Sequence, residues 1–328
     1  MPTETLLAGA MMVSLTFYVL LGGADYGGGV WDLLARGPRA ARQRELIEHA
    51  IGPIWEANHV WLILVAVVLF TAFPPAFALI CTWLHVPLML MLIGIVARGS
   101  AFTFRKYDVE DERVKLRWGH AFAFPSMVTP VLLGTVVGAI SSGVARQPDA
   151  GTTFAYFFEW VAPFPVAVGV FALVLFAFEA AVYLTLETHE ADLQEDFRWR
   201  AIGAELASGA LALAVFLLAP AEVRERLSRS WWTWPLQIAT AAFAIATLWT
   251  LWRGRFHAAR FCAAAQVSLI LWGWGLAQFP YLVRPVLTVH SAAAPAATLS
   301  MLWWSLGAGA ILLFPSYWYL FQVFKRRA

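Results

Sequence analysis

An acid, an amide and an imidazole stand together at the start of a long apolar run. The segment 55–63 reads WEANHVWLI, so a helix would place Glu56 and His59, three residues apart, on one face. Ionisable groups are costly in lipid and usually face the protein interior or a functional path. Because a carboxylate and an imidazole can both take up and release protons, we identify Glu56 and His59 as candidate proton-transfer residues.

A second acid lies at the end of the first apolar run. The segment 22–32 reads GGADYGGGVWD, and its five glycines allow a helix or a ligand to approach the backbone closely. Asp25 would then be buried, either on a proton path or simply paired with a neighbour in a packing cluster. Arg98 ends the third apolar run. It either keeps one of the acids ionised or anchors the chain at the membrane edge.

Two more acids and the histidines need separate consideration. Glu179 and Glu205 fall in later apolar runs, where they either extend a path or pair internally. Of the seven histidines, only His59 and His85 are plausible interior residues. The sequence offers no regular axial pair for haem and no zinc spacing. We therefore expect this chain to bind no metal and no haem.

The composition indicates an integral membrane protein. The chain has 328 residues, of which 60% are hydrophobic and 13% charged, with 17 Trp and a net charge of +2. Nucleic acid is an unsuitable partner, because it requires clustered Lys and Arg. Cys81 and Cys262 each lie inside an apolar run and form no metal or redox motif, so we expect them to be packing residues.

Apolar runs of about 20 residues, the length that crosses a bilayer, predict nine helices in a single integral membrane domain, 1–328. The runs are too long and too uniformly apolar for membrane strands, so the predicted class is an all-α polytopic protein. The expected spans are residues 5–31, 54–73, 75–97, 119–142, 160–186, 201–219, 232–252, 259–281 and 297–323.

The distribution of positive charge predicts the orientation. With the N-terminus outside, 18 of the 23 Lys and Arg residues fall in cytoplasmic loops or in the C-terminal tail. The positive-inside rule therefore predicts an external N-terminus and a cytoplasmic C-terminus. In that arrangement Asp25, Glu56 and Arg98 all lie toward the cytoplasmic face.

These segments resemble subunit II of the cytochrome bd-type quinol oxidases, including the cyanide-insensitive branch. The resemblance covers nearly the whole chain and is most specific in the second of four matching segments, which are residues 22–32, 52–63, 98–105 and 274–281. It implies two four-helix bundles, 1–142 and 160–281, and an additional peripheral helix, 297–323.

The resemblance also implies a function. It implies a haem-free subunit of a complex in the bacterial cytoplasmic (inner) membrane, paired with a homologous subunit I that carries haems b and d and the main quinol site. That complex would oxidise quinol and reduce oxygen to water with protons drawn from the cytoplasm. In the family, the acid at the position of Glu56 is often Asp and lies on a proton path, while the matches of Asp25 and Arg98 are functional or structural.

Other components and other functions stay open at this stage. A structural quinone or lipid, bulk membrane lipid and a small single-span subunit are further possible partners. The first alternative function is a secondary transporter with buried acids, although such acids more often lie near the midplane. The second is a purely structural subunit whose acids serve assembly.

Overall fold

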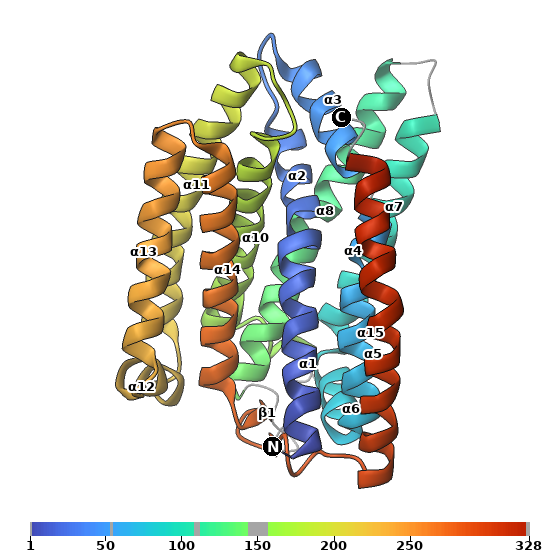
Figure 1. Ribbon diagram of the computed structural model, residues 1–328, viewed down its shortest axis with the longest axis vertical. Helices are drawn as coiled ribbons and strands as arrows, with labels where there is room; N and C mark the ends of the chain where they lie inside the picture. The colour runs from blue at the N-terminus through green and yellow to red at the C-terminus, as the bar shows by residue number, and fades with distance from the viewer. Residues whose placement is uncertain (1, 53–54, 108–111, 144–156, 326–328) are drawn as a thin grey trace.

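The computed structural model describes residues 2–52, 55–107, 112–143 and 157–325, and it is almost entirely helical (Figure 1). Within these residues, nine helical stretches are long and apolar enough to cross a membrane, which confirms the all-α polytopic class. They are Thr3–Leu34, Trp55–Ala72, His85–Arg105, Arg117–Ser142, Pro163–Leu184, Ala191–Leu218, Thr233–Trp252, Phe256–Gln278 and Ala296–Leu320.

The first span contains a local change of helix type. It runs through α1 (Thr3–Phe17), the π-helical turn η1 (Tyr18–Gly22) and α2 (Gly23–Leu34). A single π turn inside an α-helix is often found at functional sites, and here it ends three residues before Asp25. The charged helix α3 (Ala40–Ile51) follows, at the end of the molecule drawn at the top in Figure 1. We call this the α3 end, and the opposite one the β1 end.

The second and third spans differ from the sequence prediction. The second begins as the short helix α4 (Trp55–Asn58), turns at His59 and continues as α5 (Val60–Ala72). The predicted third span, 75–97, is wrong, because the chain forms a separate helix α6 (Pro74–Trp83) and then α7 (His85–Tyr107). Pro87 supplies the physical reason: it has no N–H to donate, and its ring would clash with the carbonyl four residues earlier in a continuous helix.

Close helix packing joins the first and second halves of the chain. Helix α8 (Glu112–Ser142) and helix α10 (Pro163–Leu184) lie against each other, and α10 also contacts α2 (Figure 1). A Cβ added at Gly134 of α8 would lie only 2.7 Å from the carbonyl oxygen of Val168. Small residues of this kind let membrane helices approach closely without a hydrophobic driving force.

The second half continues with α11 (Ala191–Leu218), the short polar helix α12 (Ala221–Arg229), α13 (Thr233–Trp252) and α14 (Phe256–Gln278). Helices α11 and α14 pack against α10, while α12 and α13 lie farther out and contact α14. Helix α11 starts ten residues before the predicted 201, because its first turns extend beyond the apolar stretch and carry charged side chains. The division into bundles 1–142 and 160–281 stays a prediction.

The chain ends in a short hairpin and a long peripheral helix. Strands β1 (Tyr281–Val283) and β2 (Leu287–Thr288) pair antiparallel, a feature that the sequence did not predict. Helix α15 (Ala296–Lys325) packs on α1 and α5 at the edge of the molecule (Figure 1). Most of its surface is exposed, as expected for a helix that faces lipid or another subunit.

Candidate functional site

Asp25 is buried and paired with an amide. Its side chain is 4% exposed, and its Oδ2 accepts a hydrogen bond of 2.7 Å from Nδ2 of Asn58. Asn58 ends α4, and its Oδ1 lies 3.5 Å from the hydroxyl of Tyr317 in α15. Two distant parts of the chain therefore hold the amide that orients the carboxylate. A hydrogen bond to a charged group is stronger than one between neutral groups.

Arg98 is also buried, but it does not end a span. It is 1% exposed and lies inside α7, which continues to Tyr107, so the predicted position at the end of the third run is wrong. Its Nε donates to Oγ of Ser126 at 3.1 Å, and its guanidinium lies 4.5 Å from the ring centroid of Tyr26. Nη2 has no hydrogen-bond partner among the described residues. The arginine is thus a fixed positive charge beside α2.

His59 lies between aromatic rings at the turn from α4 to α5. The ring centroids of Tyr18 and Tyr26 are each 6.0 Å away, and that of Trp55 is 6.1 Å away. Both imidazole nitrogens are buried without a hydrogen-bond partner in the described part of the chain. Tyr18 and Tyr26 face each other at 3.4 Å between their hydroxyl oxygens. The sequence analysis did not single out these two tyrosines, although Tyr26 directly follows Asp25 in the chain.

Glu56 is exposed, whereas the sequence predicted a side chain that faces the interior. Its side chain is exposed on the surface of the chain, whereas Asn58, two residues later, is the buried member of this segment. Because α4 is a single turn and breaks at His59, the expected shared face of Glu56 and His59 does not form as a continuous helix face. Within the described residues, Glu56 makes no side-chain hydrogen bond or ion pair. It is therefore available to water or to another subunit.

A half-open cleft leads to Asp25 from the α3 end. It offers about 60 Å³ of space to water-sized molecules, between residues of α2, α3, α4, α10 and α14. Asp25 and Asn58 line it together with Glu187 and Arg260. Arg260 is exposed and lies 4.8 Å over the ring of Tyr183, another lining residue. The cleft thus opens to the surface beside the buried carboxylate, with a lining that is mostly apolar.

Charged pairs stabilise the α3 end of the molecule. The sequence analysis did not identify them. Asp32 accepts from Arg105 at 3.0 Å, and both side chains are largely buried, while Glu48 lies 3.3 Å from the same guanidinium. Asp32 follows Asp25 by seven residues, a spacing that puts both acids on one helix face. This spacing was the available signal.

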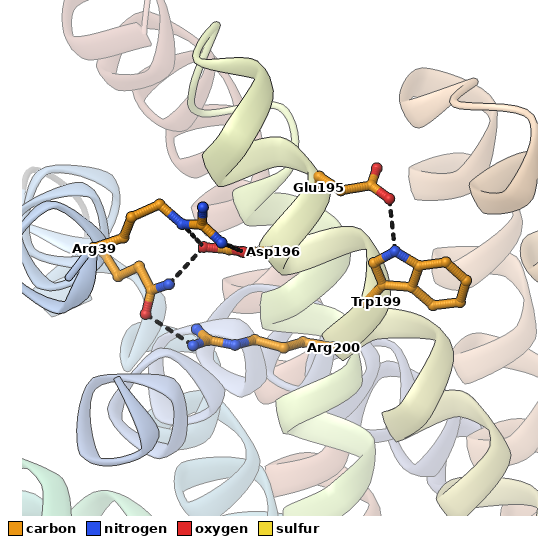
Figure 2. Close-up of polar contacts among 6 residues, drawn as sticks. Arg39, Glu195, Asp196, Trp199 and Arg200 are labelled. Atoms are coloured by element: carbon orange, nitrogen blue, oxygen red, sulfur yellow. Dashed lines mark hydrogen bonds and ion pairs between the residues drawn. The ribbon is translucent and has the colours of Figure 1, made fainter. Parts of the chain in front are cut away.

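A second polar network joins α3 to α11 (Figure 2). Asp196 accepts from Arg39 at 2.8 Å and from Gln43 at 2.7 Å, and Arg200 donates to Oε1 of Gln43 at 2.8 Å. The ion pair with Asp196 raises the pKa of Arg39, so this guanidinium stays charged. Within the same turns of α11, Glu195 accepts from the indole of Trp199 at 2.6 Å. These contacts hold the first turns of α11 against α3.

The fourth matching segment, 274–281, lies at the β1 end. Trp274 donates to Oγ of Ser141 at 2.8 Å. The buried Arg284 donates to the carbonyl oxygen of Ala277 and to Oε1 of Gln278, and so occupies the carbonyl end of α14. Burial and the nearby positive charge of Arg226 lower the pKa of Arg284. We interpret the role of this segment as structural, because its contacts stabilise the C-terminal end of α14.

The structure does not bring the two candidate interior histidines together. His85 lies at the start of α7, where its Nδ1 is 2.9 Å from the carbonyl oxygen of Thr82, whereas His59 lies at the other end of α5. In the described residues, no group of three or more His, Cys, Asp or Glu side chains could hold a metal ion. Cys81 and Cys262 are free and partly buried.

The acids of the second half are likewise buried. Glu179 in α10 is 0% exposed, and Glu205 in α11 accepts a hydrogen bond of 2.7 Å from Gln266 in α14. For Glu205 the structure thus favours the alternative of an internal pair. Neither acid lines the cleft that reaches Asp25.

Membrane-length helices that bury a carboxylate, an amide and a guanidinium near one end define a polytopic membrane protein with an internal polar site. Comparison with known proteins makes the assignment specific. The chain belongs to the family described as cytochrome bd terminal oxidase subunit II, whose sequence model matches residues 3–324.

Relatives and a solved structure agree with this assignment. Subunit 2 of the cytochrome bd ubiquinol oxidase of Bacillus subtilis is 29% identical over 57% of this chain and 55% of the relative. Subunit 2 of the cytochrome bd-I ubiquinol oxidase of Escherichia coli K12 is 27% identical over 56% of this chain and 48% of the relative. These alignments span about half the length of each relative.

The fold is similar to a chain in the structure of bd oxidase from Geobacillus thermodenitrificans. The TM-score is 0.83 with 22% sequence identity, and the alignment covers 99% of both chains.

Proposed function

We propose that this chain is the haem-free subunit II of a quinol oxidase in the bacterial inner membrane, which oxidises quinol and reduces oxygen to water. In this proposal it supports a subunit I that carries haems b and d, and it conducts protons from the cytoplasm toward those haems. Family membership supports the assignment to the complex. The proton path is argued from the buried groups of this chain.

The observation that carries the proposal is the Asp25–Asn58 pair beside the cleft. A carboxylate can relay protons only if it exchanges them with water on one side and passes them on at the other. Asp25 lines a half-open cleft, and its hydrogen bond of 2.7 Å to Asn58 fixes the position of its oxygen. Arg98, buried beside α2, favours the ionised form of nearby acids, so Asp25 can lose its proton after accepting it.

Glu56 and His59 complete the proposed path on the other side of Asn58. His59 has two buried ring nitrogens with no partner among the described residues, so it can accept a proton from a water molecule placed between the groups. Glu56 is exposed at the start of the second span. A carboxylate at that level needs water or a protein partner, and we propose that it hands protons to subunit I.

In this proposal the cofactors belong to subunit I, and this chain binds neither haem nor metal. A structural quinone or a lipid and a small single-span subunit are additional partners that fit the proposal. The long exposed surface of α15 offers room for lipid or for such a helix. Quinol and oxygen are then substrates of the complex, and this chain touches neither.

The test is oxygen consumption with quinol, expressed per haem, in membranes that contain the complex with Asp25→Asn. The amide preserves shape and one hydrogen-bonding oxygen but removes the titratable group. We expect turnover to fall by at least about tenfold, the lower part of the range for loss of a general acid or base, while haem content per complex stays unchanged.

The matched control is Asp192→Asn, which changes the same chemical group at an exposed position at the α3 end, on α11. It should leave turnover unchanged. Full turnover in Asp25→Asn would exclude the relay, whereas loss of haem together with turnover would assign Asp25 to assembly.

A further inference from the structure

Two carboxyl groups in the second half of the chain are buried with incomplete hydrogen bonding. Glu179 is 0% exposed, and neither of its carboxyl oxygens has a hydrogen-bond partner among the described residues. Glu205 is 4% exposed; its Oε1 accepts from Gln266, while its Oε2 has no partner in that part of the chain. Because both side chains are enclosed by this chain, docking of another subunit cannot supply the missing contacts.

The positive charges near these acids are directed elsewhere. Arg260 in α14 is exposed and lies over the ring of Tyr183. Arg200 in α11 donates to Gln43 and lies 5.4 Å over the ring of Trp31. By contrast, the first half buries Arg98 close to the helix that carries Asp25. An ionised carboxylate in the interior of a membrane protein requires such a partner, and Glu179 and Glu205 have none among the described contacts.

The hydrogen bonding around Glu205 indicates what is missing. Gln266 donates its amide to Glu205, which leaves its own Oε1 without a donor, although Gln266 is buried. The hydroxyl of Ser208, three residues after Glu205 on the same face of α11, is also buried and unpartnered in the described part of the chain. A proton on Glu205 Oε2 would supply a donor to a site that otherwise contains mainly acceptors.

Glu179 is placed by a glycine of the first span. A Cβ added at Gly23 would lie 2.8 Å from Glu179 Oε2, so only glycine leaves room for this carboxyl against α2. The contact puts Glu179 beside the helix that carries Asp25 while it stays outside the lining of the cleft. The carboxyl group of Glu179 therefore lies between α10 and α2, in space that Gly23 leaves open.

We propose that Glu179 and Glu205 each bind one proton and are neutral carboxylic acids, so that α10 and α11 each hold a proton-binding group outside the lining of the cleft that reaches Asp25. Each carboxylate takes one proton from a solvent hydronium ion, which becomes water, and no other reactant is required. This inference goes beyond the proposed proton path and does not depend on it.

Infrared spectroscopy of the purified complex tests the proposal, because a protonated carboxyl group has a carbonyl stretch distinct from that of a carboxylate. At neutral pH, Glu179→Gln and Glu205→Gln should each remove one such band. Haem content should stay unchanged, because an amide has nearly the shape of a neutral acid. The control Glu195→Gln should remove none, since Glu195 is exposed and paired with Arg198 at 2.8 Å.

Two results would overturn the proposal. One is a spectrum in which either Gln variant keeps all the protonated-carboxyl bands of the wild type. The other is a carboxylate band that depends on Glu205 and shifts when Na⁺ is replaced by a large organic cation, which would indicate a metal-cation site. If a Gln variant fails to assemble, Glu→Asp at that position must show a shifted protonated-carboxyl band, and its absence would also refute the proposal.

Discussion

At the scale of single residues, the buried acids of the two halves of the chain have different surroundings. Asp25 has an amide donor and a cleft beside it, and Arg98 is buried near its helix. Burying a charge is favourable only when pairing and hydrogen bonds offset the loss of water. The environment of Asp25 therefore suits a group that changes its protonation state, whereas Glu179 and Glu205 lie where a permanent proton is favoured.

Glu56 provides a residue-scale prediction. Because its side chain is exposed on this chain, Glu56→Gln should leave folding and haem content unchanged but lower turnover with quinol, and Glu56→Asp should retain part of the activity. Oxygen consumption per haem and haem per complex are the two measurements. Haem-depleted complexes in Glu56→Gln would instead indicate a structural contact with subunit I.

At the scale of elements, the contribution of an ion pair to the free energy of unfolding depends on how deeply the pair is buried. The Asp32–Arg105 pair joins α2 to α7 and is largely buried. Asp32→Asn removes its charge-assisted hydrogen bond while Glu48 stays beside Arg105, so it should lower the free energy of unfolding by about 2 kcal/mol. The exposed pair of Arg42 with Glu190 joins α3 to the residue before α11, and Glu190→Gln should cost about 1 kcal/mol or less.

Thermal inactivation of the solubilised complex measures this difference. Asp32→Asn should inactivate at a clearly lower temperature than wild type, and Glu190→Gln at nearly the wild-type temperature. Equal effects of the two variants would show that burial does not determine the strength of these pairs.

The elements were largely predictable from the sequence, because apolar runs of membrane length are a strong signal. The prediction of one span at residues 75–97 was wrong for a physical reason. The apolar composition continues across α6 and α7, and only Pro87 marks the break between the two helices. The early start of α11 was missed because the part of a helix that extends out of the membrane is no longer apolar. Hydrogen bonds of Asp196 and Arg200 hold these first turns in place.

The site was only partly predictable. Asp25 is buried as expected, whereas the role of Arg98 was left open and its position at the end of a run was wrong. Both lie against residues that no sequence spacing could pair with them, such as Asn58 and Ser126. Glu56 was expected in the interior, but its side chain is exposed on the surface of this chain. Amides and tyrosines were overlooked because they carry no charge, although they supply the hydrogen bonds and rings around the acids.

At the scale of the whole molecule, the excess of basic residues predicts the orientation. The 23 Lys and Arg residues are concentrated in loops at the α3 end and at the C-terminus, so this end should be cytoplasmic. In a background with Cys81→Ala and Cys262→Ala, His189→Cys should react with an impermeant thiol reagent only from the cytoplasmic side. Glu225→Cys, on α12 at the other end, should react only from outside, and labelling of both from one side would contradict the orientation.

The central claim is that protons enter through this chain by way of Asp25. Proton uptake during turnover, measured with a pH-sensitive dye on the cytoplasmic side of the complex in liposomes, tests it most directly. The account predicts that Asp25→Asn lowers this uptake and the rate of oxygen reduction by the same factor, at least about tenfold, with haem content unchanged and with Asp192→Asn behaving as wild type. Uptake at the wild-type rate in Asp25→Asn, from the same side and with intact haems, would contradict it.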